Sequence, residues 1–139
     1  MIDMVEDKEI ESEVVKFLDR EVRRSIMLIH SATSISSPSF DGMPKGSSNG
    51  NSSERKMIAY ADAKAKMELV NSAFDMMDDD EAAVLQGLYV KGWTVTKISM
   101  ELCLSRRSVF RLRKRGLLDF AYCYNAGELI DRLTSKETA

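Results

Sequence analysis

The residues best suited to chemistry lie between Ser105 and Arg115, where six arginines and lysines occur without an acidic residue. Guanidinium and ammonium groups bind phosphates, and an arginine can also donate two parallel hydrogen bonds to the edge of a guanine base. The segment therefore predicts recognition of a nucleic acid. The competing interpretation is the solvated face of an ordinary helix, and the elements that hold the segment decide between the two.

The charges of the chain are unevenly distributed. The 139 residues carry a formal net charge of −2, and this overall acidity alone argues against a polyanionic partner. Between Lys91 and Leu117, however, eight basic residues stand against one acidic residue, which gives this segment a net charge of +7. Such asymmetry is typical of a segment that binds a polyanion.

Two short helices are expected to position the basic segment. Thr94 is a candidate N-cap for a helix that ends at Leu102, a tight turn falls at Cys103 and Leu104, and Ser105 caps a second helix beginning at Arg106. Two helices joined by so short a turn predict a helix-turn-helix.

The apolar pattern of this region fixes which side of the second helix faces inward. The residues predicted to pack between the two helices are Ile98, Leu102, Leu104, Val109 and Leu112. Ser99 occupies the position where the helices approach closely. Cys103 stands at the turn position where glycine is frequent, because the backbone there favours a positive φ.

The outward side of the second helix then becomes the predicted DNA-binding surface. The residues predicted on this side are Ser105, Arg106, Arg107, Ser108, Phe110, Arg111 and Lys114. Arg113 and Arg115 are also predicted to bind DNA. Arginines near the start of the helix are expected to read bases, and the last three basic residues to hold phosphates. For Phe110 two interpretations stay open: contact with a thymine methyl group, or packing on the rest of the protein.

The remainder of the chain predicts an all-α fold. Apolar residues recur at helical spacing from Val5 to His30 and again over residues 54–77, which Ser53 is expected to cap. The Gly-, Ser- and Pro-rich residues 31–53 between them predict a flexible linker. The two helices are expected to form an antiparallel pair or a coiled-coil-like stem. Residues 78–124 form the DNA-binding domain.

The C-terminal residues 125–139 predict a tail with a short helix from Glu128 to Leu133. Just before it, Phe120, Tyr122 and Tyr124 are expected to close the core, in preference to forming a dimer contact. Trp93 is likewise expected to pack beneath the first helix of the DNA-binding domain.

Other classes of function are disfavoured by the composition. Two cysteines and one histidine cannot assemble a zinc site, and the five acids between Asp75 and Glu81 lack the spacing of a calcium loop; Asp78 or Asp79 instead fits a helix cap. Neither a phosphate-cradling glycine loop nor a nucleophile motif is recognisable. The sequence predicts a cytoplasmic non-enzyme without cofactor, metal or small-molecule substrate, and without membrane association.

Residues 79–118, which include "VLQGLYVKG" and the serine-led basic helix, resemble the DNA-binding region 4 of bacterial sigma factors. Over roughly residues 8–124 the chain resembles the ArpU/RinA-like transcriptional regulators encoded by phages of Gram-positive bacteria, in which an N-terminal helix, a Pro/Gly/Ser loop ("GMPKGSSNGNSSE" here) and a second helix precede a sigma-like helix-turn-helix. The resemblance implies regulation of phage late, lysis or packaging genes, or of host autolysin genes.

Alternatives remain for the partner. The expected partner is double-stranded DNA, bound by a regulator. A packaging protein similar to a small terminase subunit and a sigma-like module that contacts RNA polymerase are the competing predictions. Because a single helix-turn-helix gains affinity by pairing, a homodimer is a further expectation.

Overall fold

The chain folds as a succession of helices, which confirms the predicted all-α class. The computed structural model describes residues 5–35 and 50–138, and these residues contain no strand. The elements are α1 (Asp7–Lys16), the π-helical segment η1 (Phe17–Val22), α2 (Arg23–Ile35), α3 (Gly50–Met76), α4 (Asp79–Leu85), the π-helical segment η4 (Gln86–Val90), α5 (Val95–Leu102), α6 (Arg106–Cys123), the 3₁₀ turn η5 (Tyr124–Ala126) and α7 (Glu128–Thr138).

The first predicted helix is confirmed, and it is longer than expected. α1, η1 and α2 follow one another without interruption, and α2 continues to Ile35, into the segment predicted as linker. The next helix, α3, begins at Gly50, so the predicted cap at Ser53 is wrong. The rest of the predicted linker, residues 36–49, lies outside the described residues. A capping box starts α1, in which the Glu6 backbone N–H donates to Glu9 Oε1 at 3.3 Å.

Aromatic rings from distant parts of the sequence form the centre of the main core. The Phe17 ring lies 4.7 Å from Tyr124, and Phe120 lies 5.3 Å from Phe74 and 5.6 Å from Tyr124, between ring centroids. All four residues are buried. The first helix, α3 and α6 therefore share one core, and the predicted core positions of Phe120 and Tyr124 are confirmed.

Tyr122 departs from this prediction because its side chain is 64% exposed. Two residues along an α-helix rotate the side chain by roughly 200°, so Tyr122 points away from the face that buries Phe120 and Tyr124. The aromatic composition of this segment indicated a core but did not assign each ring to a side.

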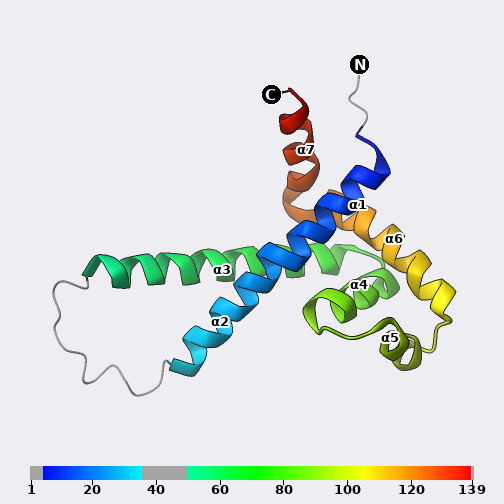
Figure 1. Cartoon of the computed structure of the whole chain (residues 1–139), viewed down its shortest axis with the longest axis horizontal. Helices are drawn as coiled ribbons and strands as arrows, with labels where there is room; N and C mark the ends of the chain where they lie inside the picture. Colours follow the sequence, from blue (N-terminus) through cyan, green and yellow to red (C-terminus); the bar gives the residue numbers. More distant parts are fainter. Residues whose placement is uncertain (1–4, 36–49, 139) are drawn as a thin grey trace.

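The helices divide the molecule into a body and a projecting arm. In Figure 1 the continuous helix made of α1, η1 and α2 crosses α3 obliquely. This helix and α3 therefore do not lie antiparallel along their length. α2 packs against α3 near the crossing. The N-terminal half of α3 and the end of α2 extend to the left. α4, α5 and the start of α6 lie at the opposite end of the molecule. The basic helix and the arm are therefore far apart.

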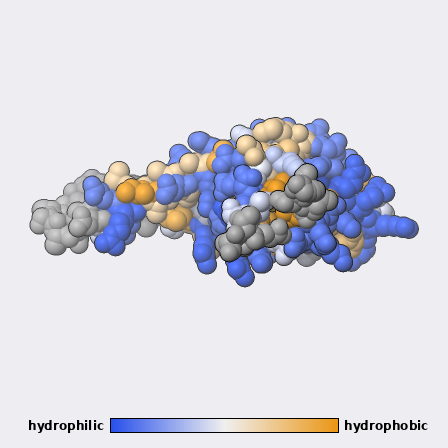
Figure 2. Space-filling view, turned by 90° about the horizontal axis from the view of Figure 1, so that it is seen from above, coloured by the Kyte–Doolittle hydropathy of each residue, from blue (hydrophilic) through white to orange (hydrophobic). Residues whose placement is uncertain are grey.

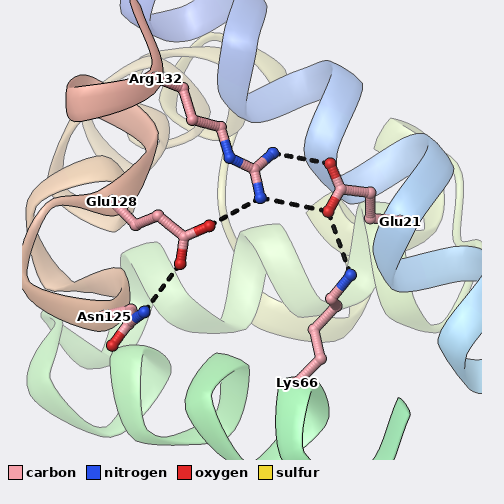
Figure 3. A network of polar contacts seen from close by, with 5 residues as sticks. All are labelled: Glu21, Lys66, Asn125, Glu128 and Arg132. Carbon is pink, nitrogen blue, oxygen red and sulfur yellow. Dashed lines mark hydrogen bonds and ion pairs between the residues drawn. The ribbon is translucent and has the colours of Figure 1, made fainter. Parts of the chain in front are cut away.

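A polar network attaches α7 to the body, as Figure 3 shows. Arg132 donates to Glu21 Oε2 and to Glu128 Oε2, each at 2.7 Å, and Lys66 of α3 donates to Glu21 Oε1 at 3.1 Å. Partial burial would raise the pKa of Glu21, but the hydrogen bonds from Arg132 and Lys66 hold that pKa below its ordinary value. α7 runs to Thr138, five residues beyond the predicted end at Leu133.

Candidate nucleic-acid interface

The basic segment lies on a capped helix, as the sequence predicted. Thr94 begins α5 and accepts a hydrogen bond from the Lys97 backbone N–H at 3.1 Å. Ser105 begins α6 and accepts one from the Ser108 backbone N–H, also at 3.1 Å. Each cap satisfies a backbone donor that the first turn of a helix leaves without an intrahelical partner. The start of α6 is thus a fixed support for the side chains that follow.

The connection between α5 and α6 is short and rigid. Cys103 adopts φ 57° and ψ 46°, the left-handed conformation expected at this position. The carbonyl oxygen of Ser99 accepts hydrogen bonds from the backbone N–H groups of Cys103 and Leu104, and the Ser99 hydroxyl donates to the Leu104 carbonyl. Ser99 therefore closes the turn in addition to permitting the close approach of the two helices.

A small core beneath the pair sets the orientation of α6. Val84 of α4 and Ile98 of α5 are buried with Val109 and Leu112 of α6. Leu88, Trp93, Val95, Leu102 and Leu104 pack around them and are partly buried. The predicted inward positions and the packing of Trp93 are confirmed. Because Val109 and Leu112 point inward, the opposite side of α6 faces solvent.

Three cations form an exposed row on that outer side. Arg107, Arg111 and Lys114 are spaced by four and three residues, which places them on one face of the helix. All three are exposed, and no ion pair or side-chain hydrogen bond joins them to another residue in the described part of the chain. Their charges are available to a polyanion.

Phe110 and Arg106 flank this row. The Phe110 side chain is 48% exposed and is not among the residues that pack against the two described core clusters. Arg106 lies 5.9 Å from the centre of the Phe110 ring, and its Nη1 donates to Thr96 Oγ1 of α5 at 3.0 Å. Thr96 was not predicted from the sequence, because its proximity to Arg106 depends on the angle between the two helices.

Two of the arginines predicted to bind phosphates already contact other side chains of the protein. Arg113 is half-buried, and its Nε donates to the Tyr89 hydroxyl at 3.1 Å. Arg115 remains largely exposed, but its Nε lies 3.5 Å from Glu81 Oε2. These two arginines do not belong to the exposed row. The predicted residues Ser105 and Ser108 likewise engage each other in the helix cap.

Glu81 is the unusual acid of this region. Only 1% of its surface is exposed, and its Oε1 has no hydrogen-bond partner among the described residues. Burial, followed by a side-chain hydrogen bond with Asp119, raises the pKa of Glu81 to about 7, although Arg115 acts in the opposite direction. The sequence placed Glu81 only in the first turn of an acid-capped helix.

Two further lysines contribute positive charge beside α5. Lys91 and Lys97 lie 4.6 Å and 5.1 Å from the centre of the Trp93 ring. Both residues belong to the basic segment that the sequence singled out, although neither was predicted as a contact. The tryptophan holds their ammonium groups at the edge of the helix pair by cation–π attraction.

Neither a metal centre nor a membrane-spanning helix is found in residues 5–35 and 50–138. No group of three or more potential ligands from His, Cys, Asp and Glu could hold a metal ion there. None of the helices in this part is both long and apolar enough to cross a membrane.

The sequence is similar to that of a named bacterial protein. It is 27% identical over 115 residues to the "Putative autolysin regulatory protein ArpU" of Enterococcus hirae, an alignment that covers 81% of this chain and 80% of that protein. This similarity confirms the resemblance to an ArpU-like regulator inferred from the residues. No family model matches the sequence, and no solved structure matches the chain.

Proposed function

We propose that this protein is a DNA-binding transcriptional regulator that acts in the bacterial cytoplasm and inserts the start of α6 into the major groove. In this proposal α5 and α6 act as a helix-turn-helix. The regulated genes are phage late, lysis or packaging genes, or autolysin genes. A regulatory role is supported by the similarity to ArpU of Enterococcus hirae.

The observation that carries the proposal is the exposed row of Arg107, Arg111 and Lys114. Their charges are not neutralised by acids of the described chain, and the helix that bears them is capped at Ser105 and buried along its other side. An exposed aromatic ring such as Phe110 is unusual on a helix face that contacts only solvent. In a recognition helix, that ring fits the methyl group of thymine.

The first experiment measures binding to the regulatory DNA of the phage or host genome that encodes the protein. Footprinting identifies the protected site, and fluorescence anisotropy at several salt concentrations then gives the dissociation constant. We expect log K to fall linearly with log salt, by about 0.9 for each phosphate contacted. Absence of a footprint and of measurable affinity at low salt would overturn the proposal.

The second experiment separates base recognition from charge. Arg107→Ala and Arg111→Ala should each reduce discrimination between the footprinted site and a scrambled duplex by about 1–3 kcal/mol. Arg23→Ala is the matched control, because Arg23 is an exposed arginine on α2. In Figure 1 α2 lies away from the start of α6. Lys114→Ala should weaken binding to both duplexes equally. It should also reduce the slope of log K against log salt by about 0.9, the contribution of one phosphate contact.

A further inference from the structure

α3 carries a second apolar stripe that the described part of the chain does not cover. Ile58, Ala65, Leu69 and Met76 follow each other at spacings of seven, four and seven residues, which align along one side of an α-helix. Ile58 is 59% exposed and Met76 65%, and the other two are also exposed. The stripe runs for about 27 Å at 1.5 Å per residue.

A neighbouring side of the same helix, about 120° round from the stripe, already packs into the core. Ala63, Val70, Ala73 and Phe74 are buried against the rest of the molecule. α3 is therefore apolar on two neighbouring faces, and only one of them has a partner among residues 5–35 and 50–138. A helix that is apolar on two faces normally buries both. Figure 2 shows hydrophobic residues on the surface of the projecting arm, whereas the other end of the molecule is mainly hydrophilic.

We propose that the exposed stripe of α3 pairs with the same stripe of a second copy of this chain, with the two helices antiparallel. The spacing of the stripe is symmetric about the level of residue 67. Ile58 and Met76 are equally far from that level, and so are Ala65 and Leu69. A two-fold axis at this level places Ile58 opposite the partner's Met76 and the large Leu69 opposite the partner's small Ala65. An isologous interface requires this self-complementarity.

The charges of α3 favour the antiparallel direction. Arg55 and Lys56 outweigh the single acid Glu54 near the N-terminal end of the helix. Asp75 lies in its last turn, and Asp78 follows two residues after the helix ends; all five residues are exposed. Antiparallel pairing brings the basic end of each helix to the acidic end of its partner, whereas parallel pairing brings like charges together. The helix dipoles favour the same direction.

The flank of the stripe supports the same direction. Lys64 and Glu68 are both exposed and occupy positions on either side of the two-fold level. Antiparallel pairing therefore brings Lys64 of each copy toward Glu68 of its partner. The inference does not depend on DNA binding, because it rests on the stripe and charges of α3 alone. In Figure 1 α5 lies beyond the C-terminal end of α3, so an antiparallel pair would place the two copies of α5 at opposite ends of the paired helices.

Sedimentation velocity across protein concentrations tests the pairing. The full chain should sediment as a dimer at micromolar concentration, and Ile58→Glu and Leu69→Glu should each raise its dissociation constant at least tenfold. Both positions are exposed, so the variants should keep the helical circular dichroism of the parent. Met27→Glu is the control, because Met27 is an apolar, 56% exposed residue of α2 that does not belong to the stripe.

A monomer at every concentration up to about 100 μM would overturn the proposal. Dissociation by Met27→Glu but not by Leu69→Glu would also overturn it. Cysteine cross-linking then tests direction, in chains whose Cys103 and Cys123 are replaced by serine. Under mild oxidation, a mixture of Ile58→Cys and Met76→Cys chains should give a covalent mixed dimer. Efficient cross-linking of either variant alone would indicate parallel helices and contradict the proposed arrangement.

Discussion

Glu81 couples the acid-rich start of α4 to the basic helix α6. Its side chain is buried between these helices, where it contacts Arg115 and Asp119. Gly116 of α6 allows this close approach, since a Cβ atom there would lie 3.4 Å from Glu81 Cβ and 3.3 Å from Leu85 Cγ. A carboxylate in such a position loses hydration, which a single ion pair at 3.5 Å compensates only in part.

The raised pKa of Glu81 predicts that stability depends on pH. Because the folded state binds this proton more tightly than the unfolded chain, the free energy of unfolding should decrease as pH rises from about 4.5 to about 7. Glu81→Gln removes the titration while keeping the shape of the side chain. The variant should therefore be more stable than the parent at pH 8, by about 1–3 kcal/mol, and should lose that advantage near pH 4.5.

Urea unfolding of both proteins at several pH values measures this difference. Asp80→Asn is the matched control, because Asp80 is an exposed acid in the same first turn of α4. A stability difference between Glu81→Gln and the parent that stays constant from pH 4.5 to pH 8 would contradict the assignment of the proton to Glu81.

The start of α6 combines a structural cap with the predicted contact surface. Ser105 Oγ accepts a hydrogen bond from the Ser108 backbone N–H. The exposed row begins at Arg107, two residues after Ser105. The positive end of the helix dipole adds to the attraction of this row for an anion. The Cys103 turn supports the same end, and its left-handed conformation costs about 1 kcal/mol relative to glycine.

Two substitutions at Ser105 should separate capping from DNA binding. Ser105→Ala removes the cap and should lower the free energy of unfolding by about 1 kcal/mol. Ser105→Asp keeps a capping oxygen, so stability should stay near that of the parent, while its negative charge should weaken DNA binding by repelling phosphate. Thermal unfolding and fluorescence anisotropy provide the two measurements. If Ser105→Asp bound DNA as tightly as the parent, the start of α6 would not lie against the DNA.

At the scale of the whole molecule, the Glu21 network and the burial of Leu129 in the main core attach α7 to distant parts of the chain. Glu21 accepts from both Arg132 and Lys66, which are 111 and 45 residues away along the chain. The Arg132 guanidinium also lies 5.6 Å from the centre of the buried Phe17 ring. The network therefore joins the first helix, α3 and α7 around one aromatic residue.

A double-mutant cycle measures what this network contributes. Glu21→Gln and Arg132→Gln should each destabilise the protein, and their coupling energy should be about 0.5–1 kcal/mol, since both side chains are about one-third exposed and partly screened. The coupling energy should decrease with added salt, which screens the two charges. It should also decrease as the pH falls through the lowered pKa of Glu21, below 4.5, because the carboxylate then becomes protonated. Urea unfolding at low and high salt provides the values, and additive effects of the two changes would show that the pair is not coupled.

The sequence determined the helical elements, the caps at Thr94 and Ser105, the unusual turn at Cys103 and the inward side of α6. These features depend on neighbouring residues and on the 3.6-residue period, so the local pattern specifies them. The same period identified Arg107, Arg111 and Lys114 as outward-facing.

Tertiary structure alone decided which of the predicted residues are already engaged. Arg113 binds Tyr89, Arg115 faces Glu81, and Tyr122 points to solvent because packing between distant segments selects one side of each helix. The uncovered stripe of α3 belongs to the same class of features. Its apolar residues are visible in the sequence. Only the placement of the other helices shows that the described residues bury one face of α3 and leave the other exposed.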